Sequence, residues 1–558
     1  MKKSLKEKDI SSVTSIKIHT TRPGRLCANC AKMASPLFKT SHINVPTGAS
    51  VYTLSVKINT TNESGGVAYA MTHEHALAQY ATTGMLDGYV HVDGQTQLSR
   101  ILELVEKCSN EYVAQVAVYA HEKGFMKDTA ALLLAYLMKK DRGLFNTIFG
   151  RVITNGRMLR TFVQIVRSGT FGSRSFGSNA KRQIQKWLNE ASDKTIINAS
   201  IGSDPSLKDI IKMVHPKAPD EKRNQLYRWV CDMGYQEDKL PKQLQLYLKL
   251  KRNPETAEQL PDVPFQMYTS MGLTTEGWKH VANNATWNQT RMNLATFERH
   301  GVFGDKEFTR RIAEKLTSER DIIRSKAMPF AIFSAFKKAE DISVEIRRAL
   351  NVAAEISLQN VPALNGKTVV AIDRSGSMNS RINSRSTIRV MDVAAVLVAA
   401  LKKKNPGLEI VLFNDSASMY EPAEGKSLLS ISKELSEKAT GGTDCGAAMS
   451  FIKRRYADKG MPDNIIMISD NESWMSTSKT FWTSTGTVKV LEEIQEQNPN
   501  ARMVNIDVTP GSSSQTIPKD CVLNIGGFND SVFQIVSMFF ESKGNPDFWV
   551  NQIKSIQL

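Results

Sequence analysis

The hydrophobic pattern of this chain changes once, near the segment "LNGK" at residues 364–367, and this change limits the folds open to it. From about residue 66 to residue 357, apolar residues recur at three- and four-residue intervals in short pieces separated by Gly, Asn or Asp. After the change, continuous apolar runs alternate with helical segments. Because 558 residues exceed what one hydrophobic core can organise, the pattern predicts two or three domains of different class.

The first pattern predicts an all-α domain at residues 51–360. Its expected helical segments include residues 96–108, 111–124, 127–140, 155–169, 222–235 and 321–341. So many short helices without strands cannot all be buried in one bundle, and stacked helix pairs with irregular repeats are expected instead. Such an array curves, and a sufficiently curved array can close into a ring. Residues 1–50, polar and punctuated by Pro and Gly, are interpreted as an N-terminal extension.

The second pattern predicts an α/β domain at residues 361–558. Strands are expected at residues 368–373, 408–415, 464–470, 502–508 and 521–528, and helices at residues 386–404, 444–460, 488–497 and 530–542. Continuous apolar strands between helices are typical of a doubly wound parallel sheet that is covered on both faces. Ligands of such sheets bind at the carboxyl ends of the strands.

Oxygen-bearing side chains gather at these predicted strand ends. Asp373, Ser375 and Ser377 alternate after the first strand, Thr443 follows a Gly-Gly pair, and Asp470 ends another strand. Oxygen ligands of this kind suit a divalent cation such as Mg²⁺, which keeps several waters beside one or two carboxylates. Helix capping is the alternative interpretation, but three loops in order favour a metal site. No His, Cys or Lys accompanies the cluster as a base for a nucleophile, so no catalytic residue is predicted.

A second feature is a basic stretch without a single acidic residue, Arg151 to Lys186. Its eight cations are Arg151, Arg157, Arg160, Arg167, Arg174, Lys181, Arg182 and Lys186. A Gly/Ser-rich segment with Phe171 and Phe176 lies inside it, and hydroxyls, cations and aromatic faces together suit single-stranded RNA. A solvated helix face is the alternative, although such faces normally mix charge signs. Further candidate contacts follow at Lys208, Lys212 and His215.

The net charge of the chain agrees with this interpretation. A net charge of +16 indicates a polyanionic partner. No apolar run approaches the roughly 20 residues needed to cross a bilayer, and no secretory signal is recognisable, so a cytoplasmic protein is expected. Cys27 and Cys30 form one C-x-x-C pair without recognisable further zinc ligands, and two free thiols are the preferred interpretation.

Taken together, the two halves resemble the Ro autoantigen family, a TROVE module followed by a von Willebrand factor A domain, in its bacterial or phage-borne form. The resemblance runs from about residue 50 to about residue 545. The segments that carry it are "KDTAALLLAYL", "NGRMLRTFVQIVRSG", "SLKDIIKMVHPK", "TWNQTRMNLATFERHGVF", "AMPFAIFSAF", "AIDRSGSM", "GGTDCGAAMSF", "MISDNES" and "LNIGGFNDSVF". Each is weak alone, but their order and joint presence are specific.

The resemblance implies a ring of irregular HEAT-like repeats joined to the von Willebrand domain, and an RNA-binding protein that is not an enzyme. Single-stranded 3′ ends of misfolded non-coding RNAs would enter a basic central hole, and Y RNAs would bind the outer surface. It also implies a link to a 3′-to-5′ exoribonuclease, polynucleotide phosphorylase, in RNA quality control.

Residue by residue, Ser375, Ser377 and Thr443 match the family's metal ligands, and Asp373 and Asp470 complete the metal-ion-dependent adhesion site. Lys181 and Arg182 match a basic pair near the hole. The segment around His215 matches one used at the outer RNA surface, where Leu207 replaces a histidine usual in animal members.

The alternative hypothesis from a different class is a protein-docking adaptor that uses the metal loops to bind a partner's carboxylate. The sequence does not name the RNA, the nuclease or the partner of the metal site, and it assigns no function to residues 1–50.

Overall fold

The computed structural model describes residues 60–61, 67–83, 94–124, 126–254, 260–339, 341–382, 386–470, 485–509, 513–516, 521–527, 530–541 and 547–558. All of these described residues belong to one compact unit. The predicted N-terminal extension and the Cys27/Cys30 pair lie outside the described residues.

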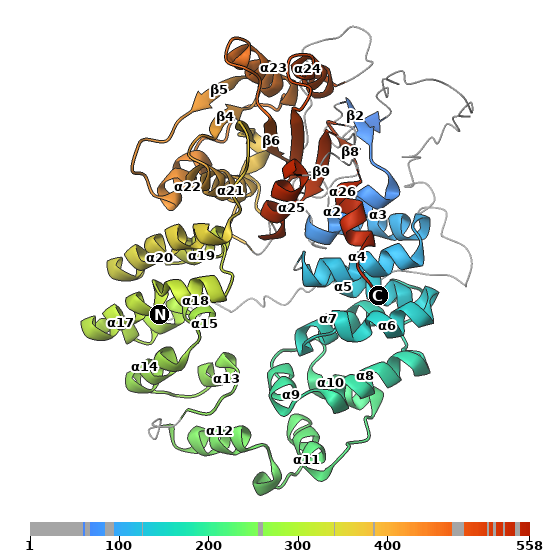
Figure 1. Cartoon of the computed structure of the whole chain (residues 1–558). Helices are drawn as coiled ribbons and strands as arrows, with labels where there is room; N and C mark the ends of the chain where they lie inside the picture. Colours follow the sequence, from blue (N-terminus) through green and yellow to red (C-terminus); the bar gives the residue numbers. More distant parts are fainter. Residues whose placement is uncertain are drawn as a thin grey trace, which may run out of the picture. The chain divides into compact units, whose positions relative to one another are not determined.

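The first part of the larger unit is an array of short helices (Figure 1), and the predicted all-α class is confirmed. The helices are α2 (His73–Thr83), α3 (Gly94–Lys107), α4 (Asn110–Glu122), α5 (Lys127–Lys140), α6 (Arg142–Val152), α7 (Gly156–Ser168), α8 (Ser178–Glu190), α9 (Asp193–Ala199), α10 (Leu207–Val214), α11 (Glu221–Val230), η1 (Glu237–Lys239), α12 (Lys242–Arg252), α13 (Phe265–Thr269), α14 (Thr275–Asn284), α15 (Trp287–Met292), α16 (Leu294–Arg299), η3 (Val302–Gly304), α17 (Lys306–Leu316), α18 (Glu319–Arg324), α19 (Pro329–Lys337), α20 (Val344–Ser357) and η4 (Leu358–Asn360).

Side-chain caps begin many of these helices. Ser109, Asp141 and Asn155 accept hydrogen bonds from backbone amides in the first turns of α4, α6 and α7. Such caps satisfy amides that have no partner inside the helix, so they fix where each helix starts. The apolar positions behind them pack into one core that continues through the array.

Of the predicted helical segments, one is interrupted and another ends earlier than the periodicity indicates. The segment at residues 321–341 is two helices, because the chain breaks around Lys326, which has a φ of +50°, and α19 restarts with Pro329 in its first turn. The segment at residues 222–235 stops with α11 at Val230, and Asp232 follows with a φ of +54°. The spacing of apolar residues in a sequence does not predict which residues adopt a left-handed backbone conformation.

The C-terminal part is an α/β domain, as predicted. Its strands are β3 (Thr368–Asp373), β4 (Glu409–Phe413), β5 (Ala417–Tyr420), β6 (Asn464–Ser469), β7 (Arg502–Asp507) and β9 (Val522–Gly526), in the order β5-β4-β3-β6-β7-β9. Its helices are η5 (Gly376–Asn379), α21 (Val390–Lys404), α22 (Leu428–Ser436), α23 (Cys445–Tyr456), α24 (Gly486–Gln495), α25 (Asp530–Glu541) and α26 (Phe548–Lys554). The five predicted strands pair in parallel, and the unpredicted β5 pairs antiparallel with β4 at the edge.

Alternate residues of each parallel strand enter different cores, as the two-residue period of a strand requires. Val370 and Ile372 of β3 belong to the core that contains α21, α22 and α25 and continues into the helical array. Val369 and Ala371 belong to a second core with α23 and α24. Both faces are therefore covered, and the carboxyl ends of the strands are where polar side chains can gather.

A second, small sheet was not predicted. It joins β1 (Thr60–Thr61), β2 (Val67–Ala70) and β8 (Ser513–Ser514) in that order, with antiparallel pairing. Strand β2 comes before the helical array, whereas β8 lies between β7 and β9 of the α/β domain. The expectation of an array without strands is wrong here, because β2 depends on a partner more than 400 residues away.

The helical array contacts the α/β domain at both of its ends. At the end of the array, α19 and α20 contact α21 and α22, and at its start, α2 contacts β9 and α26. Helix α26 also packs on α4, where the Gln115 side-chain amide donates to the Lys554 carbonyl at 2.7 Å. None of the described helices combines the length and apolar character that crossing a membrane requires.

Candidate functional site

The first candidate site is built at the carboxyl end of β3. Asp373 is completely buried, and its two carboxylate oxygens accept hydrogen bonds from the Ser375 amide at 2.7 Å and the Ser469 hydroxyl at 2.6 Å. The hydroxyls of Ser375 and Ser377 lie 3.1 Å apart. The alternation in the sequence therefore places three oxygen-bearing side chains together, and Ser469 ties them to the end of β6.

The loop that carries Thr443 is fixed against the β3 loop by backbone hydrogen bonds. The Gly376 amide donates to the Gly441 carbonyl at 2.9 Å, and the Thr440 amide donates to the Arg374 carbonyl at 2.6 Å. Gly441 has a φ of +84°, and a Cβ there would lie 2.6 Å from the side-chain amide of Asn414. Glycine is therefore required at this point. Thr443 itself is buried.

Asp470 follows the last residue of β6 and is also buried. Burial, and then the negative charge of Asp470, raise the pKa of Asp373 above its usual range. Two buried carboxylates that repel each other favour a cation nearby, because the cation would offset their repulsion. Within the part of the chain that the structure describes, no three His, Cys, Asp or Glu side chains cluster, so hydroxyls would have to complete the donor set.

The second candidate site is the basic surface of α7 and α10. Along α7, Arg157, Arg160, Gln164 and Arg167 follow one another at three- and four-residue steps, opposite the buried residues of the same helix. This spacing puts them on one face. The predicted basic stretch therefore includes a continuous stripe on a helix surface.

Some of the predicted RNA-contact residues form ion pairs with acidic side chains of the protein. The Arg151 guanidinium pairs with Glu122 at 2.9 Å and also donates to the Gln557 carbonyl. Lys186 lies 3.9 Å from Glu190, and Lys208 lies 2.7 Å from Asp232. These three cations are partly neutralised where they stand.

Arg160 is tied to the neighbouring helix rather than to an acid. Its guanidinium donates to the carbonyls of Ala199 and Ile201, and burial lowers its pKa. A Cβ at Gly202 would lie 2.7 Å from this guanidinium, so the loop after α9 closes over it. Arg160 therefore holds α7 to the α9–α10 segment.

The remaining predicted cations are exposed, and none has an ion pair with an acidic side chain of the described residues. They are Arg157, Arg167, Arg174, Lys181, Arg182 and Lys212. His215 is exposed as well, in the left-handed position that ends α10, with a φ of +50°. The structure brings Arg167 and Lys212 to one pocket, whose lining does not include Lys181 or Arg182 of α8.

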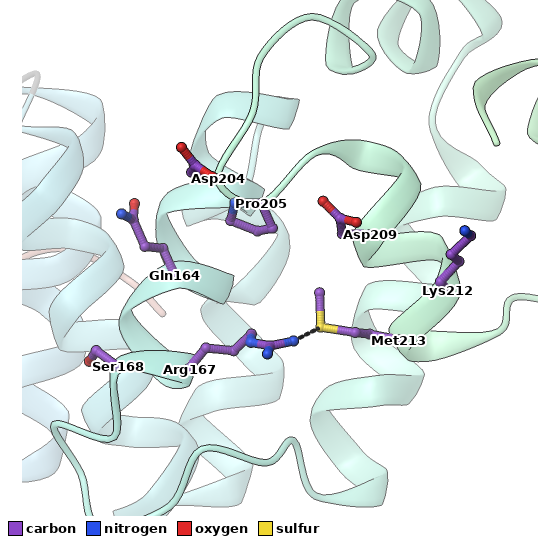
Figure 2. Close-up of a pocket in the computed structure, with 8 residues that line it drawn as sticks. All are labelled: Gln164, Arg167, Ser168, Asp204, Pro205, Asp209, Lys212 and Met213. Carbon is purple, nitrogen blue, oxygen red and sulfur yellow. Dashed lines mark hydrogen bonds between the residues drawn. The ribbon is translucent and has the colours of Figure 1, made fainter. Parts of the chain in front are cut away.

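That pocket, of about 640 Å³, lies between α7 and the segment 204–213 (Figure 2). Arg167 reaches across it and approaches the Met213 sulfur at 2.8 Å. Asp204 and Asp209 also line it. Hydrogen bonds from the Ser206 hydroxyl and amide lower the pKa of Asp209, which caps α10 and stays ionised. The pocket is therefore of mixed charge.

The aromatic part of the sequence argument is wrong for Phe176. Its ring is buried, and its centroid lies 6.4 Å from that of Phe162 in the core. Phe171 is half-buried and packs edge-on against Tyr136, with 6.2 Å between centroids. The Gly/Ser-rich sequence around both rings favoured an exposed position, but the rings pack against aromatic side chains of neighbouring helices instead.

Sequence reasoning also missed the residues that brace the loops of the first candidate site. Asn414 at the end of β4 holds the second loop, because its side-chain amide donates to the Thr440 carbonyl at 2.9 Å. Ser469 binds Asp373 directly. Both residues lie at the ends of predicted strands, and this position could have indicated that they contact the candidate metal site.

Comparison with known proteins agrees with this description. Residues 367–540 match the family model described as the Ro60 vWA domain. The crystal structure of the Ro (RSR) protein of Deinococcus radiodurans is similar in fold, with a TM-score of 0.59 and 16% sequence identity, over 85% of this chain and 100% of that one.

The class of protein is thus a helical array joined to an α/β domain of the von Willebrand factor A type. Residues 367–540 are similar to the Ro60 vWA domain, and the fold of the chain is similar to that of the Deinococcus Ro (RSR) protein. The resemblance to the Ro autoantigen family is confirmed at these two levels.

Proposed function

We propose that this chain is an RNA-binding protein of the Ro type and acts without catalysis. The observation that carries the proposal is the set of six exposed cations from α7 to α10 that form no ion pair within 4 Å with an acidic side chain of the described residues. Cations that the protein does not neutralise are available for phosphates, and each phosphate contact releases counterions. The match of residues 367–540 to the Ro60 vWA domain model supports the same function.

In its finer form, the proposal assigns single-stranded 3′ ends of misfolded non-coding RNAs to a basic central hole and Y-like RNAs to the outer surface. A 3′-to-5′ exoribonuclease, of which polynucleotide phosphorylase is the expected example, would degrade the captured RNA in the cytoplasm. Affinity purification of the full chain with and without RNase treatment tests the nuclease link, because an RNA-tethered nuclease is released by the treatment.

The test of RNA binding compares two labelled RNAs, a hairpin with a single-stranded 3′ tail of about ten nucleotides and the same hairpin without it. We expect tighter binding of the tailed RNA. If all six cations contact phosphates of a single strand, log K should fall with log salt with a slope of about −4. Fluorescence anisotropy over a salt series measures both quantities. Equal affinity for the two RNAs, or no binding at low salt, contradicts the proposal.

We further propose that Asp373, Ser375, Ser377, Thr443 and Asp470 hold a divalent cation, most simply Mg²⁺. Two buried carboxylates and closely spaced hydroxyls support it, since hard cations select oxygen ligands. When bound, such an ion supplies an open coordination position for an oxygen of a partner. The second candidate function, a protein-docking adaptor, rests on this same set.

Replacing Ser375 by alanine is expected to weaken Mg²⁺ binding by at least about tenfold, because it removes one proposed ligand. Affinity for the tailed RNA should stay within about twofold, since the cations of α7 to α10 lie on other elements. Isothermal titration with MgCl₂ and RNA anisotropy measure the two effects. Ser418→Ala on the exposed edge strand β5 is the control. Unchanged Mg²⁺ affinity in Ser375→Ala, or loss of both activities, contradicts the assignment.

A further inference from the structure

A second pocket, of about 570 Å³, lies between α10, α11 and α12 and belongs to neither of the two candidate sites described above. Three aromatic residues line it, Trp229, Tyr235 and Tyr247, together with Lys208 and Lys251. The rest of the lining consists of serine hydroxyls from the segment before α10, the Asp232 carboxylate and the apolar side chains of Leu207, Val230 and Leu248. Aromatic faces, hydroxyls and cations therefore meet in one hollow.

Tyr235 is unusual because a large aromatic side chain remains 38% exposed. Its loop is nonetheless held at several points. The Met233 amide donates to the Arg228 carbonyl at 2.9 Å, and the Gln236 amide donates to the Gln225 side chain at 2.8 Å. The Arg228 guanidinium also donates to the Gly234 carbonyl. A fixed loop thus presents the ring to solvent beside the pocket.

The two lysines of this pocket differ in their surroundings. The Asp232 carboxylate lies 2.7 Å from the Lys208 ammonium, and this hydrogen bond raises the pKa of Lys208. Lys251 is exposed in the last turn of α12 and has no ion pair within the described residues. Lys251 is therefore the cation that is available to a ligand, while Lys208 is shared with Asp232.

We propose that this pocket binds one unpaired nucleotide of a bound RNA, with its base against Tyr235 and Trp229 and a phosphate at Lys251. The inference rests on the proposed RNA binding and gives it a specific position. Base stacking on aromatic side chains and cations along the backbone are the two components of single-strand recognition, and both are present here. An apolar peptide segment would leave the lysine and the hydroxyls without partners.

Helix α10 connects this nucleotide pocket with the surface described above. Lys208 lines the nucleotide pocket, and Lys212, one turn further along α10, lines the pocket that contains Arg167. Four residues of an α-helix advance by about 6 Å. A strand that crosses α10 can therefore meet the cations of both pockets in succession.

The experiment uses the full chain and a labelled single-stranded RNA of about 12 nucleotides, in fluorescence anisotropy over a salt series. Tyr235→Ala should weaken binding by about tenfold without changing the salt slope, whereas Tyr235→Phe, which keeps the ring, should bind like the wild type. Lys251→Ala should reduce the steepness of the slope by about 0.7. Lys249→Ala, on the same helix but not in the lining, is the matched control.

Equal losses in Tyr235→Ala and Tyr235→Phe would overturn the stacking role. Wild-type affinity in Tyr235→Ala would overturn the nucleotide pocket but leave the proposed function standing, provided that the triple variant Arg174→Ala, Lys181→Ala, Arg182→Ala still loses affinity. Absence of RNA binding by the wild type would overturn both. Since Tyr235 and Lys251 are exposed, circular dichroism should show that all four variants keep the fold.

Discussion

Replacing Arg174, Lys181 and Arg182 together by alanine is expected to weaken binding of the tailed RNA by at least about a hundredfold at 50 mM salt. All three side chains are exposed, and none has an ion pair among the described residues. If each contacts one phosphate of a single strand, the slope of log K against log salt should become shallower by about 2. The loss should be similar across RNA sequences, because phosphate contacts carry no base information. Anisotropy with two unrelated tail sequences checks both points.

The control for this triple variant removes the same charge from the α/β domain. Arg454, Lys459 and Lys489 are exposed there, and replacing them by alanine changes the net charge equally. If binding depended only on overall charge, the two triple variants would lose the same affinity. That outcome, or an unchanged slope in the first variant, would show that the α7–α8 cations do not contact the RNA.

Replacing Trp549 by alanine is expected to lower the free energy of unfolding by about 3–5 kcal/mol. The indole is fully buried in α26, and its N–H lies 3.3 Å from the Tyr119 hydroxyl of α4. The substitution leaves a large cavity in the contact that joins the start of the helical array to the end of the α/β domain. Urea denaturation followed by circular dichroism measures the change.

Lys554→Ala is the matched control on the same helix. Its ion pair with Glu74 is 2.7 Å long, but both side chains are well exposed, and such surface pairs contribute at most about 1 kcal/mol. If Trp549→Ala also lowered the free energy of unfolding by less than about 1 kcal/mol, the contact of α26 with α4 would add little to stability. Limited proteolysis gives a second readout, since cleavage near residues 548–558 should accelerate in Trp549→Ala only.

The sequence was most informative where one short motif determines one local geometry. β3 is predicted at residues 368–373 and begins and ends there, because a continuous run of four apolar residues, Val369 to Ile372, leads up to Asp373. Parallel strands bring their carboxyl ends to one edge, so the positions of Asp373, Ser375 and Asp470 followed from the predicted order of strands and helices. The metal that they are proposed to hold stays a prediction.

The sequence was least informative about which cations are free. Arg151 and Arg157 look equivalent in the basic stretch, yet Arg151 pairs with Glu122, 29 residues earlier, and Arg157 has no acidic partner among the described residues. Phe176 gave the same kind of error, since its burial depends on Phe162 from the preceding helix. These outcomes depend on helix packing, which a local pattern does not contain.

Elements that depend on distant partners were missed for a related reason. Strand β5 is short and lies at the edge, and the pair β2–β8 forms only when residues near 69 and 514 meet. Helix α26 packs on the start of the array although nothing in its own seven residues indicates that partner. Periodicity identifies elements, whereas their long-range pairing is set by the assembled core.

The contact of α26 with α4 has a consequence for biosynthesis. Gln115 donates to the carbonyls of Lys554 and Ile556, residues that the ribosome adds 439 and 441 positions later. The surface of α4 that receives Trp549 must therefore stay uncovered during most of translation. Contacts of such long sequence separation slow folding, and apolar surface left open in the meantime favours aggregation. A nascent chain of this protein should consequently bind chaperones through α4 until α26 has emerged from the ribosome.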